Sequence, residues 1–358
     1  MSFITGVDKR VYARVVSSPD RRFHLISKQF QFSLSAELGP EGLQLSKDTP
    51  AARFVKAAAN SELQYEASSV GTPTPVTIET YSDPAFGIED KSGLGSSAAV
   101  TAAVVGALWQ YYRGNLQSNL NTVFKMAAWA HSQAQGGKVG SGFDIAASVF
   151  GASSYVRFSP EILSGKYPEM IDKSAWDYQL DKIPLPKGAR VVLANIEGQQ
   201  ASTSAMIAKV NAWKEKEPSQ YRALLNKLEG ANRKAVASLK VLNGGDDAKL
   251  LSEFQQAFEH GRRLTRELGQ RSGANIEPPE LEALVDAALK HGAWVAKLPG
   301  AGGGDSVAAI CLDVKDQEKL RTFFSSYKPV VVRVLDIATS EEGLRIESTN
   351  RWPLGPLA

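Results

Sequence analysis

One segment constrains the fold more than any other, a glycine and serine turn that runs directly into an apolar stretch of small residues. The turn is Gly93-Leu-Gly-Ser-Ser97, and the stretch runs from Ala98 to Leu108. Because this stretch is apolar on nearly every side and too rich in small residues for a strand, it predicts a helix buried between layers. A tight turn at the positive end of a helix dipole, with outward-pointing N–H groups, predicts an anion site.

This turn alone does not identify a phosphate loop, because many glycine-rich turns before helices are only turns. No GxxxxGK[ST] pattern occurs in the chain, so the turn is not a Walker A loop. Phosphate binding and a simple turn both remain open at this point.

Two further glycine-rich elements follow. Gly300-Ala-Gly-Gly-Gly-Asp305 lies between two expected strands and has more glycines than a hairpin needs, which indicates a close approach to the backbone, with a flexible surface loop as the alternative. Lys138-Val-Gly-Ser-Gly-Phe-Asp144 places a carboxylate at the start of a small-residue helix, where an aspartate also serves as an ordinary helix cap.

Length and charge exclude several classes of protein. A chain of 358 residues is long for one hydrophobic core, so two packed lobes are expected. With 41 basic and 38 acidic residues, the net charge of +3 is too balanced for a chain whose main partner is a nucleic acid or an anionic membrane. A lone cysteine, Cys311, excludes a disulfide within the chain, and its apolar neighbours predict that it is buried.

The chain shows no targeting or spanning segment. Its first residues become charged too early for a secretory signal, and no apolar run reaches the roughly 18 residues that span a bilayer. We therefore expect a soluble cytoplasmic protein.

Hydrophobic periodicity predicts an α+β fold with mixed or antiparallel sheets. Alternation in Val11–Val16 and in Phe23–Leu34 predicts an antiparallel meander. Further strands are expected at residues 76–81, 153–158, 190–196, 293–297 and 306–312. Helices are expected at residues 98–108, 120–135, 145–149, 221–242, 247–268 and 279–291. The boundary between the lobes is placed near Lys182.

The three glycine elements, in this order, resemble those of the GHMP kinase superfamily, and the details are similar to phosphomevalonate kinases. Gly140-Ser-Gly-Phe-Asp144 and Ile276-Glu-Pro-Pro-Glu280 are the segments that point to phosphomevalonate. The resemblance implies a two-lobed α+β fold with mixed and antiparallel sheets packed against helices. It also implies an ATP site between the lobes, with an N-terminal nucleotide-binding domain at residues 1–181 and a C-terminal domain at 182–358.

The resemblance also implies site residues. The triphosphate of ATP would be bound by Lys91, Gly93, Leu94, Gly95, Ser96 and Ser97, with the Ser97 hydroxyl as a ligand of Mg²⁺. The catalytic residues would be Asp144 and Lys138. The acceptor, 5-phosphomevalonate, would be bound by Ser141, Gly142, Arg157, Ser202, Thr203, Gly302, Gly303 and Asp305.

The chemistry of a phosphate acceptor makes its own demand. A phosphate monoester is largely dianionic at pH 7, so charge repulsion is a larger obstacle than deprotonation and the site should be locally basic. We expect Lys138 and Arg157 to hold the acceptor phosphate, and Asp144 to orient a lysine or the acceptor. Lys91 and Lys209 are weaker candidates for this basic role.

The sequence departs from the family pattern at its start. Family members begin with a strand and a Pro-Gly-Lys segment, whereas this chain starts at what would be the following strand. The first strand is therefore expected to be missing, either because the given start lies inside the gene or because the protein lacks that strand. A catalytically impaired, GHMP-like nucleotide-binding protein therefore remains open, as does a sister kinase such as mevalonate or homoserine kinase, or a diphosphomevalonate decarboxylase. No oligomer beyond a monomer or homodimer is expected.

Two residues shortly before the Lys138–Asp144 element are left outside the predicted site. Gln133 stands near the position of a Mg²⁺-binding carboxylate in related kinases, but Gly136-Gly137 leave the register open. His131 is interpreted as an ordinary core or surface histidine, and the four histidines show no metal-ligand spacing.

Overall fold

The computed structural model describes residues 1–84, 94–196, 203–300, 302–304, 306–348 and 352. The chain forms two compact units, and each is discontinuous in sequence. The N-terminal unit comprises Ile4–Lys182 and the residues from Glu342 onward, and the C-terminal unit comprises Met1–Phe3 and Ile183–Glu341. The expected domains, residues 1–181 and 182–358, remain a prediction.

The N-terminal unit contains a five-stranded mixed sheet in the order β3-β7-β4-β5-β6. Its strands are β3 (Val11–Ser17), β7 (Val76–Ser82), β4 (Phe23–Ser27), β5 (Phe32–Gly39) and β6 (Gly42–Leu45). Strand β4 pairs in parallel with β7, and the other neighbours are antiparallel. The predicted meander is therefore wrong: Phe23–Leu34 falls in two strands, and β7, which is buried along almost its whole length, lies between β3 and β4.

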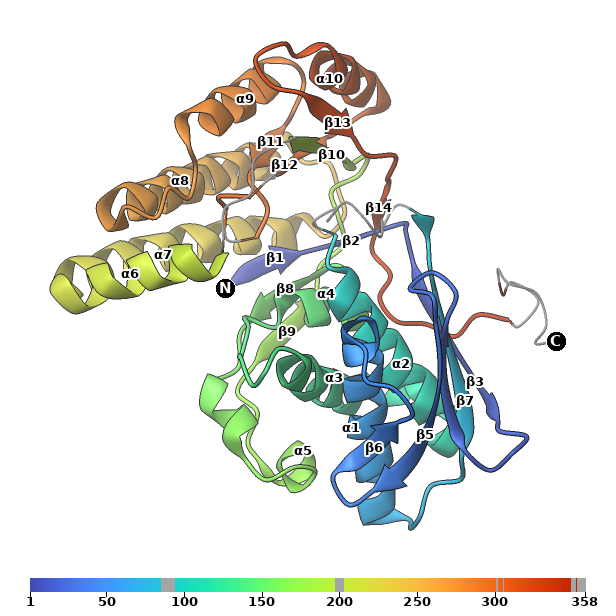
Figure 1. The fold of residues 1–358 in the computed structure, drawn as a ribbon. Coiled ribbons are helices and arrows are strands. Elements are labelled where there is room, and N and C mark those ends of the chain that lie inside the picture. Colours follow the sequence, from blue (N-terminus) through green and yellow to red (C-terminus); the bar gives the residue numbers. More distant parts are fainter. Residues whose placement is uncertain (85–93, 197–202, 301, 305, 349–351, 353–358) are drawn as a thin grey trace. The chain divides into compact units, whose positions relative to one another are not determined.

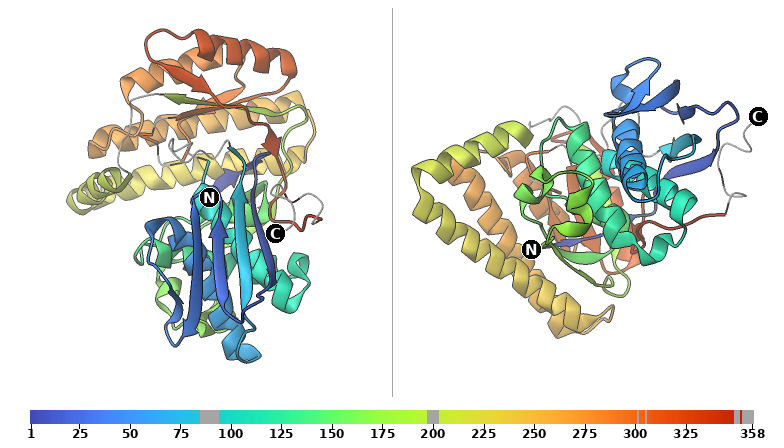
Figure 2. Two further views of the ribbon diagram at one scale, coloured as in Figure 1. Left: turned by 45° about the vertical axis from the view of Figure 1, so that its right-hand side comes forward. Right: turned by 90° about the horizontal axis from the view of Figure 1, so that it is seen from below.

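Helices pack against this sheet and bury the core of the N-terminal unit (Figure 1, Figure 2). Helices α1 (Arg53–Ser69) and α2 (Ser96–Arg113) contact the sheet, while α3 (Leu120–Ala134), α4 (Phe143–Phe150) and α5 (Glu169–Lys173) pack on other helices of the unit. Helix α2 is buried along most of its length, as its small apolar residues predict, and it contacts α1, α3 and α4. Strands β8 (Ser153–Val156) and β9 (Gln179–Lys182) form an antiparallel pair.

The C-terminal unit is a four-stranded antiparallel sheet in the order β11-β12-β10-β13, with helices on both faces. The strands are β10 (Arg190–Ile196), β11 (Val295–Lys297), β12 (Ser306–Cys311) and β13 (Val332–Val334). Ala309 and Cys311 face the core formed with α9 (Pro279–Lys290) and α10 (Val314–Ser326). Ile310 faces α7 (Pro218–Leu242) and α8 (Ala248–Ser272), as the two-residue period of a strand requires.

One further α-helix and three short strands complete the α-helices and strands of the described residues. They are helix α6 (Thr203–Lys216) and strands β1 (Ser2–Ile4), β2 (Gly6–Val7) and β14 (Thr339–Ser340). The predicted helices at 221–242, 247–268 and 279–291 are confirmed within a few residues, and Cys311 is buried. Within the described part of the chain, no helix is both long enough and apolar enough to cross a membrane.

Candidate functional site

Helix α2 begins without a side-chain cap. Gly95 stands before its first turn in the left-handed conformation, with φ at 73°, and as a glycine it provides no side-chain cap. The first N–H groups of a helix have no partner within the helix, so this start is suited to bind an anion. Of the predicted triphosphate residues, Leu94, Gly95, Ser96 and Ser97 are at this start, while Lys91 and Gly93 lie outside the described residues.

Helix α4 begins in the same way and carries Asp144 in its first turn. Gly142 precedes it with φ at 73°, and a Cβ at this position would lie 2.9 Å from Tyr155 Oη and 3.0 Å from the ring of Phe158. Tyr155 Oη donates a hydrogen bond to the Ser141 carbonyl at 3.1 Å. The positive φ and the close approach of Tyr155 and Phe158 both favour glycine at 142, directly before the turn that carries Asp144.

The two helix starts lie next to each other. A Cβ built on Gly95 would be 3.8 Å from the Cβ of Asp144, and α2 packs against α4. Asp144 Oδ1 accepts a hydrogen bond from the N–H of Ile145 at 2.9 Å, which holds the carboxylate at the helix start. The predicted triphosphate turn and the predicted catalytic aspartate thus come together within one unit.

His131, which the sequence analysis left outside the site, lies in this cluster. It stands in the last turn of α3, its Nε2 is 3.1 Å from Ser97 Oγ, and its ring stacks on Phe54 with centroids 5.3 Å apart. Burial lowers the pKa of His131, with Arg53 acting in the same direction and Asp144 in the opposite one. Its partner Ser97 is 34 positions earlier in the chain, so no local pattern could have indicated the contact.

Two exposed cations flank the start of α4. Lys138 precedes it, and Arg157 follows strand β8. Burial raises the pKa of Tyr155, while Arg157 lowers it and Asp144 raises it, so both charges lie within electrostatic reach of this tyrosine. Neither cation forms an ion pair with a carboxylate of the described residues, which leaves both available to an anionic ligand.

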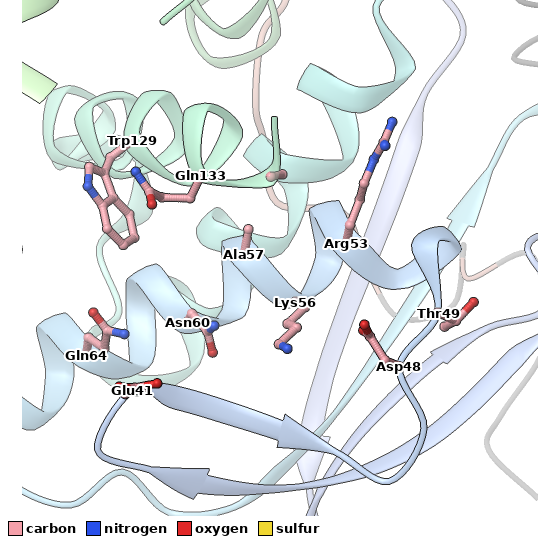
Figure 3. A pocket seen from close by; sticks show the side chains of 11 residues that line it. Glu41, Asp48, Thr49, Arg53, Lys56, Ala57, Asn60, Gln64, Trp129 and Gln133 are labelled. Carbon is pink, nitrogen blue, oxygen red and sulfur yellow. The ribbon is translucent and has the colours of Figure 1, made fainter. Parts of the chain in front are cut away.

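A cavity of about 350 Å³ opens beside this cluster, between α1 and the last turns of α3 (Figure 3). Arg53 and Lys56 come from α1, and Trp129 and Gln133 come from α3 and point toward α1. Ala134 also lines the cavity. It lies three positions after His131 and directly before Gln135, at the end of α3. Most of its lining is polar or charged, and Trp129 provides an aromatic surface.

In the C-terminal unit, Gly302 and Gly303 of the third glycine-rich element along the chain pack against Ile276. The N–H of Gly303 donates to the Ile276 carbonyl at 2.6 Å, and a Cβ at Gly302 would lie 2.5 Å from the same oxygen. The Gly302 N–H donates to the Pro299 carbonyl at 3.2 Å. Both amide N–H groups are therefore engaged within the protein, so any contact of these glycines with a substrate would use other atoms.

The next residue of that segment, Glu277, belongs to a buried ionic cluster. Arg262 donates to Glu277 at 2.8 Å and to Asp286 at 2.7 Å, which ties α8 to the segment and to α9. Of the other predicted substrate residues, Ser202 and Asp305 lie outside the described residues, and Thr203 is described only as the first residue of α6.

The donor set fits a phosphate-bound Mg²⁺ better than a metal held by the protein alone. The described residues contain no group of three histidine, cysteine or carboxylate side chains able to hold a metal. Mg²⁺ in nucleotide sites needs only one or two protein oxygens besides phosphates and water. Ser97 Oγ and the Asp144 carboxylate supply such oxygens at adjoining helix starts.

Comparisons with known proteins agree with this arrangement. The family model for the N-terminal domain of GHMP kinases matches residues 53–152, and the model for their C-terminal domain matches residues 248–330. Together these matches span more than half of the chain. The chain belongs to the GHMP kinases.

The most similar proteins include phosphomevalonate kinases. The enzyme of Gibberella zeae is 32% identical over 72% of this chain, and that of Saccharolobus solfataricus is 29% identical over 77% of it. The match spans 62% of the fungal protein and 76% of the archaeal one. The structure of Streptococcus pneumoniae phosphomevalonate kinase in complex with phosphomevalonate and AMPPNP aligns with a TM-score of 0.70, at 19% identity, over 92% of this chain and 89% of that one. This last likeness shows the GHMP kinase fold.

Proposed function

We propose that the chain is a phosphomevalonate kinase, which transfers the γ-phosphoryl group of ATP to 5-phosphomevalonate in the mevalonate route to isoprenoids. The products are 5-diphosphomevalonate and ADP. The observation that carries this proposal is the meeting of two helix starts that each follow a left-handed glycine, one with Ser97 and the other with Asp144, beside two exposed cations that form no ion pair within the described residues. The names of the relatives support phosphomevalonate as the acceptor.

The transfer needs little acid–base chemistry. An oxygen of the acceptor phosphate forms a bond to the γ-phosphorus, the bond from that phosphorus to the β–γ bridging oxygen breaks, and ADP leaves with the electron pair. Since the acceptor is largely dianionic at pH 7, it is already a nucleophile. The enzyme must chiefly position the two anions and offset their repulsion.

In this proposal, Lys138 and Arg157 hold the acceptor phosphate, and Asp144 orients the acceptor or a lysine. The start of α2, from Gly95 to Ser97, binds the phosphates of ATP, and the cavity between α1 and α3 takes the nucleoside end (Figure 3). Mg²⁺, when bound with ATP, would neutralise charge on the β- and γ-phosphates and would be held by the Ser97 hydroxyl.

Roles for the remaining predicted residues complete the proposal. We assign Lys91, Gly93 and Leu94 to the nucleotide, and Ser141, Gly142, Ser202, Thr203, Gly302, Gly303 and Asp305 to the acceptor. The protein acts in the cytoplasm as a monomer or homodimer, although one similar plant enzyme is named as peroxisomal.

A coupled ADP-release assay with mevalonate, 5-phosphomevalonate and diphosphomevalonate tests the proposal. Turnover that depends on the monophosphate is expected. Turnover with mevalonate alone would replace the proposal by a mevalonate kinase, a class that is also among the relatives. If ADP binds but no acceptor supports turnover, the chain is a GHMP-like nucleotide-binding protein.

A further inference from the structure

His131 connects three parts of the N-terminal unit through its ring. Nε2 contacts the Ser97 hydroxyl at 3.1 Å, and one ring face stacks on Phe54 at an interplanar angle of 27°. We propose that His131 is a positioning residue, which fixes the Ser97 hydroxyl so that its oxygen faces the phosphates of the nucleotide and their cation. This inference rests on the proposed function, because it takes Ser97 to be part of the nucleotide site.

A serine at the start of a helix needs such a partner to point in one direction. Its side chain has three staggered rotamers, and its hydroxyl proton rotates freely unless a hydrogen bond holds it. Ser97 stands in the first turn of α2, and His131 is the side chain that holds its hydroxyl in the described structure. The bond therefore selects one rotamer before any ligand arrives.

The ring is itself held in place. It is only 9% exposed, it stacks on Phe54 of α1, and the amide of Gln135 lies 3.3 Å from Nε2 and 3.4 Å from Nδ1. Phe54 is covered in turn by the guanidinium of Arg53, 4.8 Å from its ring centre. Helix α1 and the end of α3 thus determine where Nε2 lies, and the hydrogen bond to Nε2 in turn fixes Ser97 Oγ on α2.

The hydrogen-bonding capacity of a hydroxyl explains the advantage of this arrangement. A serine hydroxyl has one proton and two lone pairs. If Nε2 accepts the proton of Ser97, both lone pairs remain for a cation. Preorganisation of this kind lowers the cost of ordering the site when the nucleotide binds.

Three substitutions of His131 separate this role from packing. His131→Phe keeps an aromatic ring against Phe54 but removes the nitrogen. His131→Gln places an amide about as far from the backbone as Nε2, whereas His131→Asn reaches only as far as Nδ1. ADP is titrated by calorimetry into each variant with Mg²⁺ and again with EDTA, and thermal unfolding without nucleotide monitors the fold.

We expect His131→Phe and His131→Asn to weaken Mg²⁺-dependent binding of ADP about ten-fold, His131→Gln to recover most of it, and the change with EDTA to be much smaller. In a Ser97→Ala background, His131→Phe should change binding less than two-fold, because the two residues act as one pair. Equal losses in both backgrounds, or no loss in a folded His131→Phe variant, overturn the inference. If the unchanged chain binds no ADP, the proposed function falls and the inference with it, whereas ADP binding without kinase activity leaves this test intact.

Discussion

Arg157 provides a residue-scale test of the acceptor assignment. Arg157→Ala removes an exposed guanidinium that pairs with no carboxylate among the described residues, so the KM for phosphomevalonate should rise by about ten-fold or more while the KM for ATP changes little. Steady-state kinetics with each substrate varied in turn measure both constants. Lys166→Ala, which removes an exposed cation of the same unit paired with Glu169, is the matched control. An unchanged KM for the acceptor would remove Arg157 from the site.

Gly142 provides a second residue-scale test, based on backbone conformation. Its φ of 73° disfavours any side chain, and a Cβ would meet Tyr155 Oη at 2.9 Å. We expect Gly142→Ala to lower the free energy of unfolding by about 2 kcal/mol and to lower kcat by displacing Asp144. Gly136→Ala is the control, since φ there is 70° but nothing lies within 4 Å of its Cβ. Equal effects of the two changes would show that strain alone, and not the contact with Tyr155, matters.

At the scale of elements, helix α1 shows which parts of the fold the sequence pattern could not predict. The buried small-residue helix α2 and the long helices of the C-terminal unit were predictable from their periodicity. Helix α1 was missed, and its buried face carries Glu62 and Glu66, two carboxylates that obscure an apolar stripe. Arg113, at the end of α2, forms ion pairs with both carboxylates and offsets part of the cost of burying them. The parallel pairing of β4 with β7, and the contact of His131 with Ser97, likewise join residues with no local signal in common.

Glu62 makes the stability of this helix layer depend on pH. Burial raises the pKa of its carboxyl to about 8; Glu66 adds to this rise, and Arg113 opposes it. The folded state keeps a proton on Glu62 that the unfolded state releases near the ordinary pKa of 4.5. The contribution of this group to the free energy of unfolding therefore falls as pH rises from about 4.5 to about 8, and it does not change further above pH 8.

The neutral variant Glu62→Gln removes this dependence. At pH 8 we expect the variant to unfold at a higher urea concentration than the unchanged chain, with a free energy of unfolding that is larger by a few kcal/mol. At pH 5 this difference should be much smaller. Urea titrations at the two pH values measure the difference. Glu161→Gln, on an exposed residue of the same unit, should leave the pH dependence as it was. If the difference between Glu62→Gln and the unchanged chain were the same at pH 5 and pH 8, Glu62 would not be the group that keeps a proton on folding.

At the scale of the whole molecule, each unit has hydrophobic clusters of its own. One large cluster fills the N-terminal unit, and the clusters around β10, β12 and the α7–α8 pair belong to the C-terminal unit. The start of α2, Ser97, His131 and Asp144 all lie in the N-terminal unit. A nucleotide that binds these residues should therefore stabilise that unit directly.

Calorimetric unfolding tests this partition. We expect two thermal transitions, and ADP with Mg²⁺ at a hundred times its Kd should stabilise the N-terminal unit by about 2.7 kcal/mol and raise the temperature of its transition. Tryptophan fluorescence can assign the transitions, because Trp109, Trp129 and Trp176 lie in the N-terminal unit and Trp213 and Trp294 in the C-terminal one. In Ser97→Ala the shift should shrink, since less nucleotide is bound at the same concentration. If ADP raised only the transition reported by Trp213 and Trp294, the nucleotide would belong to the C-terminal unit, and the start of α2 would not be its phosphate site.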